Sequence, residues 1–292
     1  MCGSNDAVEL PHCQEYTGGQ AIHICKGCGL VYVKKRRTLE EIARVWSEEI
    51  YGDITQSPSN YSARIPAVKA RQTYLADLID VNIGLKDKLV FDIGAGEGQF
   101  LKIIRDQYGA LVYGVEPSQK NCRILKQMGM DYFQGTIEQF CARSTTGNGC
   151  PKADIVTIAW TLENCGSCRS MVSCVPKVLK EDGCVVIATA SRILVPFKKP
   201  LGFYLSKNPV DTYAFRFSAN TLRGLLAVCG FEVVYVNRYI DTDVLCMIAK
   251  MRSDPARIQW ERDDYRTVYD FFERWHQESQ FYHQEQIKYE NR

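Results

Sequence analysis

The sequence lacks a charge excess of one sign, a long apolar run and a histidine in its central part. Its 36 lysines and arginines face 34 acidic residues, so the chain has no strong basic character of the kind that attracts nucleic acid. No segment approaches the ~18 apolar residues that cross a bilayer, and no signal-peptide core begins the chain, so we expect a cytoplasmic protein. The histidines are His12, His23, His276 and His283, which excludes a histidine base from the residues between.

Thirteen cysteines stand out in an otherwise ordinary composition of 46% apolar and 24% charged residues. An odd number of cysteines in a reducing compartment does not indicate a disulfide framework. We therefore expect them to be metal ligands or small buried apolar side chains.

Four segments differ in residue pattern. Residues 1–37 are rich in Cys and Gly and too poor in large apolar residues to fold by core burial alone. Residues 38–82 have helical character and form a linker or lid, and 83–252 alternate short apolar strands with helices. Residues 253–292 predict a helical tail with one apolar face, which we expect to pack on the domain or on a second subunit.

The pattern of the third segment predicts a parallel sheet. Strands are expected at about 88–93, 111–115, 131–133, 153–159 and 183–189, with helices at about 97–108, 118–128 and 170–180. A helix over 218–229 and two apolar strands, Phe231–Asn237 and Asp243–Ala249, then predict a closing antiparallel hairpin. We expect an α/β, Rossmann-like fold with a seven-stranded, mostly parallel sheet.

The first strand of this segment runs into a glycine-rich turn that begins after Asp92. Glycines at Gly94, Gly96 and Gly98 let the backbone approach a ligand and adopt turns closed to other residues. A dinucleotide fingerprint would have its third glycine at position 99, where this chain has Gln99. The turn therefore indicates a different ligand.

A carboxylate closes the second strand, at Glu116, eighteen residues after Gly98. In that position it can accept hydrogen bonds from both hydroxyls of a ribose. The alternative is that Glu116 only begins the helix after Pro117 and Ser118.

Together these features resemble class I S-adenosylmethionine (SAM)-dependent methyltransferases, over about residues 60–250. The resemblance implies a SAM-binding domain at 83–252, in which the glycine turn cradles the methionine part of SAM. The cofactor-binding residues that it implies are Asp92, Gly94, Gly96, Gly98, Glu116 for the ribose, Thr136 and Ile137 beside the adenine, and Trp160 at the end of the fourth strand.

The N-terminal segment contains Cys25-x-x-Cys28-Gly29, a turn that places two thiolates on one loop. It resembles the zinc ribbon that precedes some sugar and small-molecule methyltransferases, and Cys2 looks like the remaining half of a second turn. Four ligands are needed, and we name Cys2, Cys13, Cys25 and Cys28 for a structural Zn²⁺, with His12 as the alternative to Cys13. A metal-free remnant is the other interpretation.

For Cys165, Cys168 and Cys174 we expect buried thiols rather than a metal or redox site.

Ligands of open α/β sheets bind beyond the carboxyl ends of the strands, which places the acceptor above Trp160 and Glu163, facing residues 191–217. Many relatives have Glu-His after the fourth strand, whereas this chain has Glu163 followed by Asn164. Glu163 is the candidate base, with capping of the next helix as the alternative.

Tyr213 and Arg216 are predicted to bind the acceptor or to close the lid. Basic residues of the lid suit an anionic acceptor or are solvated; they are Arg192, Lys198, Lys199 and Lys207.

The predicted function is SAM-dependent methyl transfer to a small-molecule acceptor, a hydroxyl of a sugar, nucleotide-sugar or glycan. One alternative is a ribosomal RNA base methyltransferase, which the balanced charge disfavours. The other is a non-catalytic methyltransferase-like scaffold. We expect no membrane partner, and we name the C-terminal helix as a possible homodimer interface.

Overall fold

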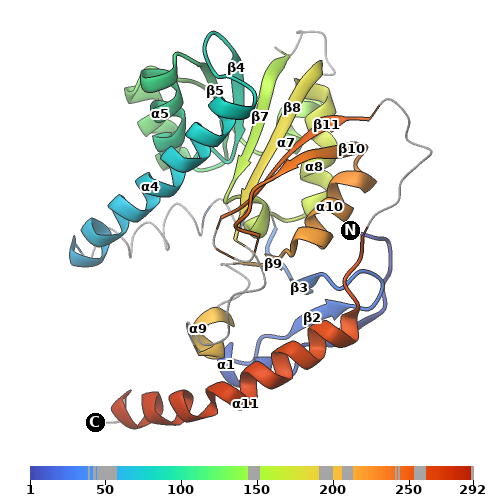
Figure 1. Cartoon of the computed structure of the whole chain (residues 1–292). Helices are drawn as coiled ribbons and strands as arrows, with labels where there is room; N and C mark the ends of the chain where they lie inside the picture. The colour runs from blue at the N-terminus through green and yellow to red at the C-terminus, as the bar shows by residue number, and fades with distance from the viewer. Residues whose placement is uncertain are drawn as a thin grey trace.

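The computed structural model describes residues 1–38, 40, 41, 44, 58–143, 152–190, 200–205, 213–240, 242, 244–252 and 261–290, without the side chains of 58–65 and 281–290. A larger α/β part contains a seven-stranded sheet, and a smaller part is built around a second sheet below it (Figure 1). The lid residues Arg192, Lys198, Lys199 and Lys207 lie outside the described residues.

The larger sheet has the strand order β10-β11-β8-β7-β4-β5-β6. Its strands are β4 (Leu89–Ile93), β5 (Leu111–Glu116), β6 (Asp131–Gln134), β7 (Ala153–Ala159), β8 (Leu179–Thr189), β10 (Phe231–Val236) and β11 (Leu245–Met251). Strands β4 to β8 pair in parallel, and β11 runs antiparallel to both β8 and β10. The predicted Rossmann-like fold with a closing antiparallel hairpin is confirmed.

Helices cover both faces of this sheet (Figure 1). On one face are α4 (Pro58–Asn82), α5 (Gln99–Tyr108) and α6 (Gln119–Gln127), and on the other are α7 (Ile137–Arg143), α8 (Cys168–Val178) and α10 (Ala219–Val228). Successive residues of a central strand point to opposite faces. Val90 therefore packs in a first apolar cluster, beneath α4, α5 and α6, and Phe91 packs in a second, beneath α7, α8 and α10. Burial on both sides explains the continuous apolar runs of the sequence.

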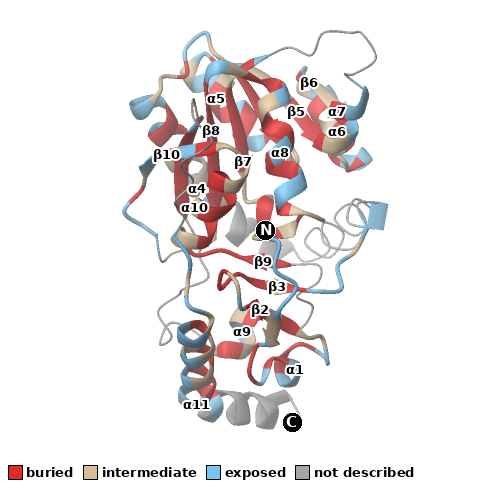
Figure 2. Cartoon of the chain, turned by 90° about the vertical axis from the view of Figure 1, so that its right-hand side faces the viewer, coloured by how far each residue is buried: buried red, intermediate tan, exposed pale blue. Residues whose placement is uncertain are grey.

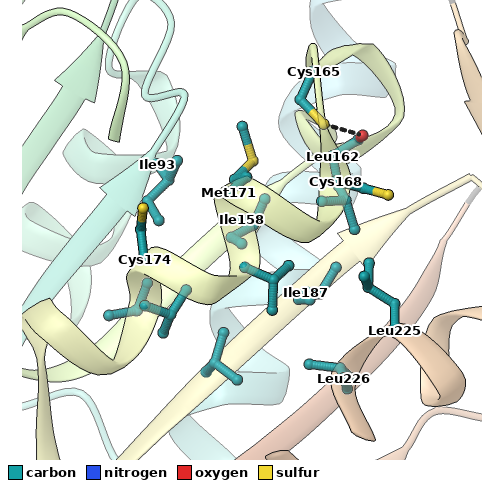
Figure 3. Close-up of a cluster of buried hydrophobic side chains, with 14 of the residues drawn as sticks. Ile93, Ile158, Leu162, Cys165, Cys168, Met171, Cys174, Ile187, Leu225 and Leu226 are labelled. Atoms are coloured by element: carbon teal, nitrogen blue, oxygen red, sulfur yellow. Dashed lines mark hydrogen bonds between the residues drawn. The ribbon is translucent and has the colours of Figure 1, made fainter. Parts of the chain in front are cut away.

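The second apolar cluster contains the three cysteines that follow β7 (Figure 3). Cys165 donates its thiol hydrogen to the carbonyl oxygen of Leu162 at 3.1 Å. Burial raises the pKa of Cys168 to about 11 and that of Cys174 to about 12, so these thiols stay protonated. The prediction that they are buried thiols is confirmed.

The smaller sheet contains strands from distant parts of the chain. Its order is β1 (Ala7–Glu9), β2 (Ile22–Cys25), β3 (Val31–Val33) and β9 (Phe215–Arg216), all antiparallel. Around it lie α1 (Cys13–Tyr16), α9 (Leu201–Leu205) and the C-terminal α11 (Tyr265–Glu290). Because β9 pairs with β3, the N-terminal segment is joined to the larger part.

The C-terminal helix supplies the large apolar side chains that the N-terminal segment lacks. Phe272 is 0% and Trp275 1% exposed, and both pack in one cluster with Ile22 and Ile24 of β2. Figure 2 shows buried residues on α11 beside exposed ones. The tail therefore packs back on its own chain, and the homodimer through this helix stays a prediction. Within the described residues, no helix combines the length and apolar character that a bilayer-spanning helix needs.

We expect Trp275→Ala to lower the free energy of unfolding by roughly 3–5 kcal/mol, since it removes a large buried side chain from this shared core. Urea-induced unfolding followed by circular dichroism measures the change. Val81→Ala, at a side chain that is 84% exposed, is the control and should shift stability by less than about 0.5 kcal/mol. Equal midpoints for Trp275→Ala and the parent would contradict the prediction.

Candidate functional site

The predicted cofactor residues gather where the parallel strands end. From β4 the chain continues to β5, its neighbour on one side, whereas its neighbour on the other side is the later strand β7. The direction in which successive strands are added to the sheet therefore reverses at β4. Such a reversal leaves a crevice at the carboxyl edge of an open sheet. Asp92, near the end of β4, pairs with Gly114 of β5 and Thr157 of β7.

The turn after β4 needs glycine for both conformation and space. Gly94, Gly96 and Gly98 have φ values of 80°, 55° and 75°, which favour glycine. A Cβ atom on Gly94 would overlap the side chain of Thr161, which follows β7. The backbone N–H of Gly94 donates to the carbonyl of Val115 at 2.8 Å and holds the turn against β5.

Glu116 links this turn to the start of α6. Its Oε2 accepts a hydrogen bond from the Gly96 N–H at 2.9 Å, and its Oε1 accepts from the Ser118 N–H at 2.8 Å. Asn121 donates its side-chain N–H to the same Oε1 at 3.3 Å. Oε1 thus accepts two hydrogen bonds, whereas Oε2 accepts one and keeps a lone pair for a further donor. Ser118 is the N-cap of α6, so Glu116 does not cap the helix; it binds the N–H of the cap residue and also faces the turn, and its ribose role stays a prediction.

Asp92 lies buried beside this arrangement. Its Oδ1 accepts a hydrogen bond from the Thr157 hydroxyl at 2.6 Å. Burial, opposed by that hydrogen bond and reinforced by the charge of Glu116, raises the pKa of Asp92 to about 7. Two buried acids favour a cationic group of a ligand between or beside them, because such a group offsets their desolvation.

The loop after β6 reaches the same edge, since the Gly135 N–H donates to the carbonyl of Glu116 at 3.0 Å. Thr136 begins α7, where its hydroxyl accepts from the Gln139 N–H at 3.3 Å. The side chain of Ile137 is 1% exposed and packs into the core. The adenine contacts of Thr136 and Ile137 stay predictions.

Trp160 directly follows β7 in a left-handed conformation, with φ at 51°. Its N–H donates to the carbonyl of Ala188 at 2.7 Å, which fixes it against the end of β8. The guanidinium carbon of Arg71, on α4, lies 4.4 Å from the centroid of the Trp160 ring. Helix α4 therefore covers the end of β7, and strained residues of this kind cluster at functional sites.

Glu163 lies in the short 3-10 helix η3 (Leu162–Asn164), buried against the end of β8. Its Oε2 accepts from the Thr189 hydroxyl at 2.9 Å, and burial raises its pKa to about 7. Ser167 caps α8 instead, by accepting from the Ser170 N–H, so the capping alternative for Glu163 is wrong. A carboxylate with a pKa near neutrality can accept a proton at physiological pH.

The two residues predicted to bind the acceptor have different surroundings. Tyr213 is 40% exposed, and its N–H donates to Asn164 Oδ1 at 2.7 Å, which ties this segment to the end of η3. Arg216 is only 3% exposed and donates to the carbonyls of Tyr213 at 2.7 Å and Leu205 at 2.8 Å. Since its guanidinium is buried and bonded to backbone, Arg216 holds β9 in place, and its predicted role as an acceptor ligand does not fit.

Three of the four cysteines named as zinc ligands come together. The sulfur atoms of Cys2, Cys25 and Cys28 all lie within 4.8 Å of one another. Hydrogen bonds from the thiols of Cys28 and Cys2 lower the pKa of Cys25, whereas the same pairing and burial raise the pKa of Cys28.

Neither proposed fourth ligand belongs to this group. Cys13 packs in the core of the smaller part, with its sulfur 3.4 Å from the N–H of Ile22. His12 stacks on His276 of α11 at 3.7 Å and lies 3.1 Å from Glu273. Both predictions for the fourth ligand are wrong, because spacing along the sequence could not show which way α1 turns.

Several residues of the site had no recognisable signal in the sequence. Thr157 and Thr161 look like ordinary strand and turn residues, and Arg71 lies on a helix far from β7 in sequence. Asn121 had a detectable signal, since it follows Glu116 by five residues at the start of a helix. Its Oδ1 is buried without a hydrogen-bond partner among the described residues.

Comparison with known proteins matches residues 68–236 to a family described as methyltransferase domain. The ubiquinone biosynthesis O-methyltransferase of Pasteurella multocida (strain Pm70) is 29% identical over 135 residues, which cover 42% of this chain and 54% of that protein. That of Glaesserella parasuis serovar 5 (strain SH0165) is 31% identical over 128 residues, covering 40% and 52%. The chain spans about half the length of these curated relatives.

Two solved structures share the fold. One is the 1,6-didemethyltoxoflavin-N1-methyltransferase of Burkholderia thailandensis with bound 1,6-didemethyltoxoflavin and S-adenosylhomocysteine, with a TM-score of 0.53 and 14% identity over 77% of this chain and 96% of that one. The other is the magnesium protoporphyrin IX methyltransferase of Synechocystis PCC 6803 with bound SAM, with a TM-score of 0.53 and 17% identity over 76% and 100%.

We expect the Glu163→Gln variant to remove part of the pH dependence of stability. A raised pKa means that the folded chain holds the proton more tightly than the unfolded chain. The stabilisation that the folded state gains from this tighter proton binding is therefore complete below pH 4.5 and is lost as the pH rises to about 7. Thermal unfolding of parent and variant from pH 4.5 to 8 should show a relative loss of parent stability on the order of 3 kcal/mol. A constant difference would contradict the raised pKa.

Proposed function

Because this chain belongs to the methyltransferase domain family, we propose that it transfers the methyl group of SAM to a small-molecule acceptor. The observation that carries the proposal is the hydrogen bond from the Gly96 N–H to Glu116 at 2.9 Å. It joins the glycine turn after β4 and the carboxylate after β5 into one site at the edge of the sheet. A site of this composition suits a ligand that carries both an amino acid and a ribose.

The residues present fit SAM in three respects. Gly94, Gly96 and Gly98 hold the turn in positive-φ conformations that favour glycine, and the buried acids supply acceptors for an ammonium and a ribose diol. The unpartnered Oδ1 of Asn121 offers another buried acceptor beside Glu116. When bound there, SAM supplies a methyl group on a good leaving group.

The proposed catalysis depends mainly on positioning, since in-line transfer requires the acceptor atom to be held close to the methyl group. Trp160 and Arg71 cover the end of β7, where the guanidinium carbon lies 4.4 Å from the ring centroid. Glu163 takes the proton of the acceptor hydroxyl, for which its pKa of about 7 is suited. Its bond to Thr189 fixes the orientation of the carboxylate.

An oxygen acceptor is supported by the names of the two curated relatives, which are O-methyltransferases. The finer expectation of a sugar, nucleotide-sugar or glycan rests on the resemblance of the N-terminal segment alone. None of the relatives reported above is named for a carbohydrate, so the proposal is limited to a small-molecule hydroxyl. The near-balanced charge continues to disfavour RNA.

We further propose that Cys2, Cys25 and Cys28 bind a structural Zn²⁺ ion. Three thiol sulfurs within 4.8 Å of one another suit three of the four positions around a tetrahedral ion. The metal would fix β2 and the turn before β3, where the segment has few large side chains.

Substitution of Glu116 tests the cofactor site. We expect the parent chain to bind S-adenosylhomocysteine in calorimetry and Glu116→Ala to bind it roughly 10–100-fold more weakly, since hydrogen bonds to a charged acceptor are lost. The control is Asp131→Asn, at an exposed carboxylate where β6 begins, and it should match the parent. Absence of binding to the parent, or parent-like affinity in Glu116→Ala, would sink the proposal.

Metal analysis of the purified protein tests the zinc site. We expect about one zinc ion per chain in the parent, and a loss of zinc in Cys25→Ser and Cys28→Ser because two thiolates alone hold the ion poorly. Cys13→Ser is the matched control, since Cys13 is a buried cysteine of the same segment outside the cluster, and it should keep its zinc. Zinc-free parent protein after purification without chelators would overturn the assignment.

A further inference from the structure

A small aromatic pocket lies between α4 and the connection of β10 to β11. It has a volume of about 250 Å³ and is lined by Tyr74, Tyr239, Thr242 and Val244. The rings of Tyr74 and Tyr239 meet edge to face, with centroids 5.8 Å apart and planes at 65°. Tyr239 is 47% exposed, so a ligand can reach the pocket from solvent.

This aromatic pocket opens on the same sheet edge as the proposed SAM site. Leu245, which begins β11, pairs with Thr189 at the carboxyl end of β8, so Val244 and Thr242 lie at that edge. Neighbouring strands are about 4.8 Å apart, and β11 is two places from β7 in the sheet. The pocket therefore lies on the order of 10 Å along the edge from the end of β7.

One helix, α4, contributes a side chain to both places. On α4, Arg71 lies over Trp160 at the end of β7, and Tyr74, three residues later on the same helical face, lies against Tyr239. An acceptor that extends along the edge beneath α4 would contact Trp160 at one end and Tyr239 at the other.

The polar groups of the pocket are arranged around Asn237, which is 2% exposed. Its side-chain N–H groups donate to the carbonyl of Val244 at 2.7 Å and to the hydroxyl oxygen of Tyr74 at 3.2 Å. The Thr242 hydroxyl donates to the carbonyl of Tyr239 at 2.9 Å. Tyr74 thus accepts from the protein and can donate its own proton to a ligand, and burial raises its pKa so that it keeps that proton.

We propose that this aromatic pocket binds the non-reacting end of the methyl acceptor, and that this end is a flat, apolar ring system with a hydrogen-bond acceptor for Tyr74. The inference rests on the proposed function and specifies its substrate class. Aromatic walls whose polar groups are few, the hydroxyls of Tyr74, Tyr239 and Thr242, favour such a ring over a carbohydrate, whose many hydroxyls would find few partners there. Binding energy from this remote end would hold the reacting hydroxyl near Trp160 and Glu163.

Calorimetry with 2,3-dihydroxynaphthalene as the probe tests the inference, on the protein with and without saturating S-adenosylhomocysteine. We expect binding to the parent, at least roughly tenfold weaker binding to Tyr239→Ala, and weaker binding to the milder variant Tyr74→Phe. Leu111→Ala removes a 60% exposed apolar side chain where β5 begins, at the opposite edge, and should match the parent. UDP-glucose should not displace the probe.

The outcomes separate this inference from the proposed function. Affinity for S-adenosylhomocysteine should be unchanged in Tyr239→Ala, since the residue does not touch the glycine turn. Failure of the parent to bind S-adenosylhomocysteine would overturn the proposed function, and with it the role of the pocket in methyl transfer. Normal cofactor binding together with no probe binding, with equal probe affinity in Tyr239→Ala, or with displacement by UDP-glucose would overturn the pocket assignment alone.

Discussion

The contact on which the site depends is the buried carboxylate of Glu116 between two backbone N–H groups. One N–H belongs to Gly96 in the turn after β4 and the other to Ser118 at the start of α6. Removing the carboxylate would leave both donors buried without a partner, which is costly for each. The close approach of Thr161 to Gly94 then fixes β7 relative to the same turn. The relative positions of the ends of β4, β5 and β7 therefore depend on the carboxylate of Glu116 and on the spaced glycines of the turn.

Most of the larger sheet was predictable, because the signal for each of its elements is local. Burial on both faces produces the runs of Val and Ile that mark β4, β7 and β8. The glycine turn and Glu116 are likewise short patterns at fixed spacing. Helix α7 (Ile137–Arg143) was not expected, because seven residues are too few to show a helical repeat of apolar residues.

Contacts between distant segments could not be predicted. Strand β9 has two residues, and nothing in Phe215 or Arg216 indicates that they pair with β3. The charge of Arg216 indicated a ligand, whereas the structure uses its donors on backbone carbonyls. The position of Arg71 over Trp160 depends on how α4 crosses the sheet. In each case tertiary packing decides the role of a residue whose type allows several.

The pairing of β3 with β9 has a consequence for biosynthesis. Val31 and Arg216 are 185 positions apart, and the apolar cover of β2 comes from α11, which begins at Tyr265. Strands β1, β2 and β3 can pair with one another early, whereas β9 and α11 are synthesised long afterwards. Until then one edge of β3 stays unpaired and the apolar side chains of β2 lack the cover that α11 provides. The proposed metal ion at the three clustered thiols would hold the turn between β2 and β3 until these partners arrive.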